Sequence, residues 1–308
     1  MLKDKILKRE TGIITYAITP PKLNNLHQKI VEISQKQVER IKNIDVDGLI
    51  IYDIQDEVDR QKEKRPFPFI ETLDPALYNE EYLKNLAVPK IIYRCVGKYN
   101  KDQFSKWVKS DKDSDRFSVF VGASSSKQEV KLKLSEAYRI SKQLNPNLIL
   151  GGVVIPERHV THKDEHIRII NKVGKGCKFF VSQVIYNLEN YKNFLSDYYY
   201  YCKDNNIEMK PMIFTITPCG SKKTLQFMKW LGINVPKWME NDLMNSQDIL
   251  HKSVSLSENI VEELLDFALE KDIPVGFNIE SLSIRKVEIE ASIKLVKDIK
   301  SIIEKRLK

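Results

Sequence analysis

Apolar residues along this chain follow two patterns, short β-branched runs and longer segments with helical spacing. In segment 26–44, for example, Ile30, Ile33 and Ile41 fall on one helical face. Comparable spacing predicts helices over 128–144, 187–203 and 258–271. The short runs predict eight strands, at residues 12–18, 48–52, 90–96, 117–121, 148–155, 178–184, 210–216 and 274–279.

The regular alternation of strands and helices predicts an α/β fold with a parallel sheet. About eight strand-helix units in 308 residues indicate closure into a (β/α)8 TIM barrel. An open dinucleotide-binding sheet is disfavoured, because no G-x-G-x-x-G follows the first strand. No linker rich in Gly, Pro or Ser interrupts the chain, so we expect a single barrel domain over 1–308, with an extra helical excursion at 235–257.

Charge and hydropathy narrow the possible partners. The net charge of +8 arises from 50 Lys and Arg against 42 Asp and Glu, spread along the whole chain. Nucleic-acid binding would need a clustered basic stripe, so we expect either an ordinary solvated surface or a basic-rimmed cleft for an anionic small molecule. Apolar runs stop short of the roughly 18 residues of a membrane span, and the charged start MLKDKILKRE does not resemble a signal peptide. A cytoplasmic protein with no membrane partner is predicted.

The cysteines predict neither a metal site nor disulfides. Cys95, Cys177, Cys202 and Cys219 lie far apart and never form a C-x-x-C pair. We expect them to be small buried apolar groups, and we expect no metal.

Three motifs resemble one known family. Residues 151–187 read GGVVIPERHVTHKDEHIRIINKVGKGCKFFVSQVIYN, residues 231–239 read LGINVPKWM, and residues 15–22 read TYAITPPK. In this order they are similar to the fifth-to-sixth, seventh and first units of the methylenetetrahydrofolate reductase family. The resemblance implies a barrel that holds FAD and reduces 5,10-methylenetetrahydrofolate to 5-methyltetrahydrofolate, with NADH or NADPH recharging the flavin.

The resemblance assigns roles to residues at the carboxyl ends of the strands, where barrel enzymes place their chemistry. Tyr93 stands in place of a family histidine, and Ser124 begins a run of three serines directly after Val121-Gly122-Ala123, where the family has Arg-Gly-Asp. That run is either an anion-binding loop or a helix N-cap. The candidates for cofactor binding are His159, Glu165, Lys172, Tyr93 and Ser124, and those for substrate binding are Gln183, Thr224 and Glu57.

The proton donor is the main departure from the family pattern. Where the family has a Glu on its first strand, this chain has Ala17, which cannot donate a proton. Glu280 follows the eighth strand, which neighbours the first in a closed barrel, and is therefore the candidate replacement acid. Alternatively, Glu280 faces a loop or pairs with Arg285. Asp53 and Glu57 are the other candidates for the acid.

Three functions follow from these observations. The first is a divergent reductase of the family. The second is a flavin-free barrel that binds tetrahydrofolate, acting in another one-carbon step or as a non-catalytic partner subunit; a homo-oligomer is also compatible. The third is a barrel enzyme of unrelated chemistry.

Overall fold

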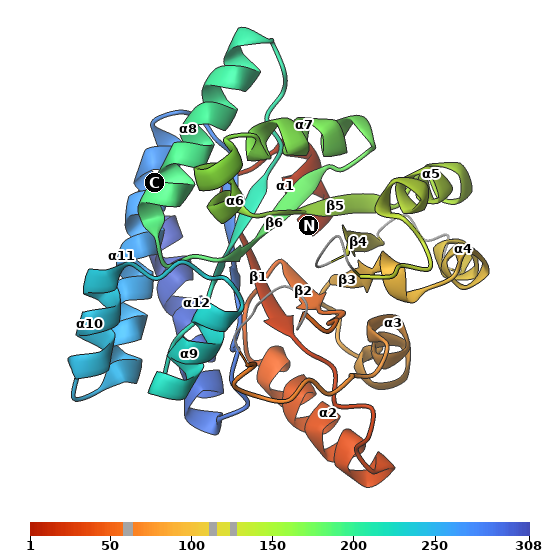
Figure 1. The fold of residues 1–308 in the computed structure, drawn as a ribbon, viewed down its shortest axis with the longest axis horizontal. Coiled ribbons are helices and arrows are strands. Elements are labelled where there is room, and N and C mark those ends of the chain that lie inside the picture. The colour runs from red at the N-terminus through yellow and green to blue at the C-terminus, as the bar shows by residue number, and fades with distance from the viewer. Residues whose placement is uncertain (58–63, 111–115, 124–127) are drawn as a thin grey trace.

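Eight parallel strands close into a barrel in chain order, as the sequence predicts (Figure 1). The computed structural model describes residues 1–57, 64–110, 116–123 and 128–308. Pairing of the last strand with the first, in the register Tyr16 with Ile279, completes the closure. The strands are β1 Ile13–Ile18, β2 Gly48–Ile51, β3 Lys90–Cys95, β4 Phe117–Val121, β5 Ile149–Val154, β6 Phe179–Val184, β7 Met212–Ile216 and β8 Val275–Ile279.

All eight predicted strands are confirmed, and their ends differ from the prediction by two residues or fewer. The largest difference is at the start of β7. Pro211 has no N–H to give to a ladder, and the N–H of Lys210 donates instead to the Tyr198 hydroxyl at 2.9 Å. The ladder therefore begins at Met212.

Helices surround the strands as an outer layer (Figure 1). A π-helical turn at Asn79–Leu83 and a 3-10 turn at Val96–Lys98 add to them. The α-helices are α1 Leu2–Lys8, α2 His27–Lys42, α3 Pro75–Tyr78, α4 Lys101–Lys109, α5 Leu134–Leu144, α6 Pro156–His162, α7 Glu165–Gly174, α8 Leu188–Asp204, α9 Lys222–Trp230, α10 Lys237–Asn245, α11 Ile249–Leu269 and α12 Lys286–Arg306.

Two predicted helices begin elsewhere. The excursion at 235–257 contains α10, but α11 starts at Ile249 rather than at 258, because the Asp248 carboxylate caps it by accepting from the N–H of His251 at 3.0 Å. The helix predicted from 128 starts only at Leu134. Before this helix, the N–H of Lys131 donates to the carbonyl of Gly97 at 3.0 Å. This bond holds the segment against the loop after β3 and outside the helix.

The barrel interior is a packed core separate from the larger core between strands and helices. Phe179 fills space opposite Gly151, where a Cβ would lie 2.6 Å from its ring. The unpredicted helix α1 covers the amino end of the barrel, with Leu2 and Ile6 packed into this interior. The four cysteines are buried and unpaired, as predicted. In the described part of the chain, no helix combines the length and apolarity that a bilayer crossing requires.

Candidate functional site

A cavity of about 850 Å³ lies at the carboxyl ends of the strands; we call it the barrel cavity. Because all strands run parallel, their last side chains meet at this one face. Each strand end contributes at least one lining residue: Ala17, Tyr52, Tyr93, Val121, Val153, Gln183, Thr215 and Glu280.

A buried polar layer connects the strands at the base of the barrel cavity. The Thr15 hydroxyl donates to Oδ1 of Asn278 at 3.0 Å. The amide of Asn278 donates in turn to the hydroxyls of Tyr52 at 3.1 Å and Thr215 at 3.3 Å. These bonds fix the Tyr52 ring, which also packs edge-on against Tyr93 with centroids 4.8 Å apart.

Glu280 is a buried carboxyl group at the bottom of the barrel cavity. It is 6% exposed, and its N–H donates to the carbonyl of Ile216 at 3.1 Å. Since Tyr16 pairs with Ile279, the next position along the two strands brings Glu280 beside Ala17, and both line the barrel cavity. Burial raises the pKa of Glu280 to about 7, against a smaller opposing effect of a hydrogen bond with Tyr52. The carboxyl group can therefore give or take a proton near neutrality.

Both neighbouring tyrosines keep their protons at neutral pH. Burial first, and the nearby Glu280 carboxylate second, raise the pKa of Tyr52 and of Tyr93 well above the ordinary value. Their hydroxyls therefore remain neutral beside the titrating carboxyl group.

Gln183 presents an open hydrogen-bond acceptor. Its amide donates to the carbonyl of Leu231 at 2.7 Å, which fixes the side chain. Its Oε1 is buried and accepts no hydrogen bond from any residue that the structure describes. Such an atom in a cavity wall suits a ligand that brings an N–H group.

The described lining is basic, with six Lys and Arg side chains against three carboxylates. Of those carboxylates, Asp53 accepts from Lys98 at 2.7 Å and from the N–H of Cys95 at 2.8 Å, so its charge is already neutralised. The cations are Arg40, Arg65, Arg158, Arg168, Lys172 and Lys175. Their excess favours an anionic ligand.

Arg65 is the cation with the most unusual surroundings. Its guanidinium lies over the ring of Trp230 at 4.9 Å and over that of Phe227 at 5.4 Å. Nε and Nη1 are buried and donate no hydrogen bond within the described chain, and the carboxylate of Asp56 is 3.9 Å from Nη1. A ligand carboxylate could accept from Nε or from Nη1, which face different edges of the guanidinium.

Comparisons with known proteins give the family of this chain. A family model described as methylenetetrahydrofolate reductase matches residues 127–274. A solved structure with 62% sequence identity covers 98% of this chain and 100% of its own, with a TM-score of 0.89. The chain belongs to the methylenetetrahydrofolate reductase family. The resemblance seen in three sequence motifs is thereby confirmed.

The 62% identical relative comes from Clostridium thermocellum and is described as an uncharacterized protein that binds two copies of 5-methyl-5,6,7,8-tetrahydrofolic acid. A glycoside hydrolase family 10 endoxylanase from a sugarcane soil metagenome is 9% identical, with a TM-score of 0.48 over 91% of this chain and 87% of its own. A psychrophilic xylanase of that hydrolase family is 11% identical, with a TM-score of 0.46 over 97% and 99%. A search of curated proteins finds no match.

The structure brings some of the residues that the methylenetetrahydrofolate reductase family suggested to the barrel cavity. Lys172 lines it and donates to the carbonyl of Val153, and burial lowers the pKa of this lysine. The others in the lining are Ala17, Glu57, Tyr93, Gln183 and Glu280. Ser124 lies outside the described residues.

Three of the suggested residues do not line the barrel cavity. His159 Nε2 lies 2.9 Å from Oδ2 of Asp197 on α8, and Glu165 accepts from the N–H of Ile155 at 2.9 Å. Thr224 donates to the buried Glu288 at 3.1 Å. Strand-end position does not reveal the partners of His159 and Thr224, because these come from helices α8 and α12, whereas Glu165 bonds back to the residue that follows β5.

Two of the sequence alternatives can also be compared with the structure. Arg285 pairs with Glu288 at 3.1 Å. Glu280 is buried and its side chain forms a hydrogen bond with Tyr52. Sequence reasoning did not identify Arg65 as a site residue. The signal available for it was the aromatic RPFPF sequence at 65–69, since arginine packs readily on aromatic rings.

Proposed function

We propose that this chain binds reduced folates of the 5-methyltetrahydrofolate class in the barrel cavity. The observation that carries the proposal is the pairing, in one cavity, of a buried carboxyl group with a pKa of about 7, Glu280, with the open acceptor of Gln183. A pterin ring carries N–H donors and ring-nitrogen acceptors that match such a pair. The ligand of the 62% identical relative supports the same class.

The opposite end of a folate is a glutamate with two carboxylates. The basic lining supplies partners for it, and Arg65 is the strongest because its buried N–H groups await acceptors. The aromatic rings under Arg65 hold the guanidinium in place, which lowers the entropy cost of binding.

The barrel cavity is large for a small-molecule site. Its volume of about 850 Å³ is near the upper end of the range of small-molecule sites. We therefore propose two folates for this chain, as in the relative.

Reduction of 5,10-methylenetetrahydrofolate is the second candidate function. The observation in its favour is Glu280 itself, since a carboxyl group with a pKa of about 7 beside Ala17 suits a general acid that protonates a folate nitrogen. FAD would supply the hydride chemistry in such a reaction, recharged by NADH or NADPH. However, neither His159 nor Glu165 lines the barrel cavity, so the proposed flavin residues do not fit FAD as a set. We derive no step through a flavin.

Calorimetric titration of the purified chain with 5-methyltetrahydrofolate tests folate binding. We expect saturable binding that weakens at least tenfold in Gln183→Leu and in Arg65→Met, because each change removes a side-chain group that forms a hydrogen bond with the ligand. Lys3→Met, at the opposite end of the barrel, is the matched control and should bind as the wild type does. Absence of saturable binding would refute the proposal. Bleaching of a yellow purified protein by NADH or NADPH would instead favour the reductase.

A further inference from the structure

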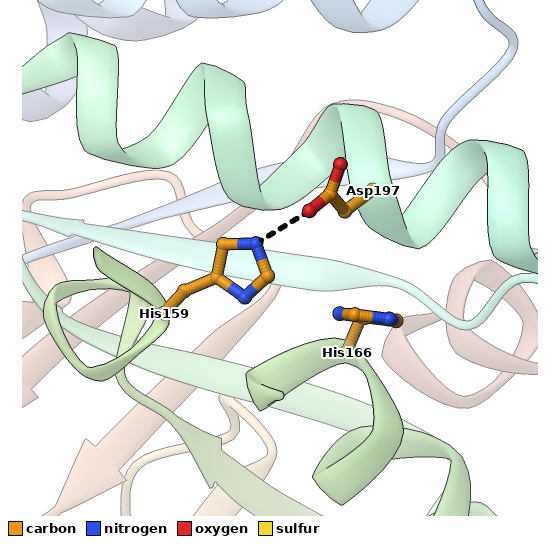
Figure 2. Close-up of side chains that lie close together, drawn as sticks. All are labelled: His159, His166 and Asp197. Atoms are coloured by element: carbon orange, nitrogen blue, oxygen red, sulfur yellow. Dashed lines mark hydrogen bonds and ion pairs between the residues drawn. The ribbon is translucent and has the colours of Figure 1, made fainter. Parts of the chain in front are cut away.

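Two histidines and an aspartate meet on the outer helical layer, away from the barrel cavity. His159 on α6, His166 on α7 and Asp197 on α8 each offer one ligand atom, and these atoms all lie within 4.8 Å of one another. Figure 2 shows the three side chains converging between the helices. None of the three lines the barrel cavity, so the folate proposal leaves this cluster unexplained.

The imidazoles are incompletely satisfied. His159 is 4% exposed, and its Nε2 lies 2.9 Å from Oδ2 of Asp197. The Nδ1 atoms of His159 and His166 are buried and have no hydrogen-bond partner among the described residues. Leaving a buried polar nitrogen unpaired costs about 1 to 3 kcal/mol. Each imidazole offers one ligand atom to an ion, so with Nε2 of His159 facing Asp197, the unpaired Nδ1 of His166 is the atom that points to a missing partner in this cluster.

We propose that His159, His166 and Asp197 bind a divalent transition-metal ion of the zinc type. Imidazole nitrogen and carboxylate oxygen are preferred ligands of Zn²⁺, and three protein ligands with one solvent position form a common set. Asp197 is exposed, so water can reach the fourth position. This assignment replaces our sequence expectation of no metal, which rested on cysteine spacing alone.

The cluster needs only small movements to hold the ion. Tetrahedral ligands roughly 2.1 Å from zinc lie about 3.4 Å from one another. Because the ligand atoms already lie within 4.8 Å of one another, side-chain rotations that move them by about an ångström or a little more bring all three to binding distance. Binding of the ion displaces any proton between His159 and Asp197, because an imidazole nitrogen that binds a metal carries no proton.

The ion would connect three consecutive helices. It links α6, α7 and α8, and α7 also carries Arg168 and Lys172, which line the barrel cavity. The expected role is therefore structural, holding α7 against α8 behind the cavity wall. Folate binding does not enter the test below, so the two proposals stand or fall separately.

Zinc titration of chelator-treated full-length protein, in competition with a chromophoric chelator, tests the site. We expect one equivalent to bind, and Co²⁺ to give visible absorption bands of a low-coordinate site. Asp197→Asn and His166→Gln should each weaken zinc binding at least tenfold. His162→Gln is the matched control, because His162 is exposed on α6 and is not part of the cluster.

Zinc should also raise the thermal midpoint of the wild type and of His162→Gln, but not that of Asp197→Asn. Circular dichroism without metal checks that the variants fold. If His166→Gln does not fold, Asp197→Asn alone decides, since it changes an exposed side chain. The proposal is overturned if no equimolar zinc binds, if binding survives Asp197→Asn, or if it is lost in His162→Gln.

Discussion

At the scale of single residues, the environment of Glu280 sets the protonation of a carboxyl group in the barrel cavity. Ala17 on the first strand and Glu280, directly after the adjacent strand β8, both line the barrel cavity. The Glu280 pKa of about 7 results from burial, which disfavours the charged form. The structure thus places an acidic group beside the first strand.

Glu280→Gln should change the pH dependence of stability. The pKa of Glu280 is about 7 in the folded protein and ordinarily 4.5. The contribution of its carboxyl group to stability is therefore fully present below pH 4.5 and is lost as the pH rises through 7. At about 1.4 kcal/mol per pH unit, the loss is about 3 kcal/mol. Relative to the wild type, the variant should therefore gain about 3 kcal/mol of unfolding free energy between pH 4.5 and pH 8.5. Urea unfolding at both pH values measures this.

Parallel pH profiles of the two proteins would contradict the raised pKa. If the chain reduces methylenetetrahydrofolate, the same variant should lose at least a hundredfold in turnover, because glutamine cannot supply a proton.

At the scale of elements, α1 contributes more than its charged sequence suggests. Leu2 and Ile6 are each 1% exposed and close the amino end of the barrel core. The motif LKDKILK places them four residues apart on one face. This spacing was available in the sequence, but a seven-residue helix with so few apolar positions gives little periodic signal.

Ile6→Ala should lower the unfolding free energy by about 2 to 4 kcal/mol, because it leaves a cavity in a packed core. Leu7→Ala, at a neighbouring position that is 51% exposed, should change it by less than about 0.5 kcal/mol. Urea denaturation of both variants makes the comparison. Equal losses of unfolding free energy in the two variants would show that α1 does not close the amino end of the barrel core. Folate affinity should not change in either variant, since the ligand site is at the opposite end.

At the scale of the whole molecule, closure of the barrel creates one shared site. Eight strand ends from distant parts of the sequence surround the same cavity. Ligands bound there contact elements from across the chain, so their binding should stabilise the entire fold.

Calorimetry should give two equivalents of 5-methyltetrahydrofolate per chain. At ligand concentrations of about 100 times each dissociation constant, the two sites together should stabilise the protein by about 5 kcal/mol. Thermal unfolding at increasing ligand concentration measures the gain. A stoichiometry of one would contradict the two-folate proposal while leaving folate binding intact.

The sequence by itself determined the strand order, the parallel barrel and the family. Hydrophobic periodicity is local, and parallel closure follows from eight repeated units, so both are present in the chain pattern. The tertiary structure alone decided which strand-end residues face the barrel cavity. His159 follows β5 but contacts α8, because helix packing brings Asp197 to it across 38 positions of sequence. The pKa of Glu280 and the metal-ligand cluster have the same origin, since burial and side-chain proximity between distant segments exist only once the chain is folded.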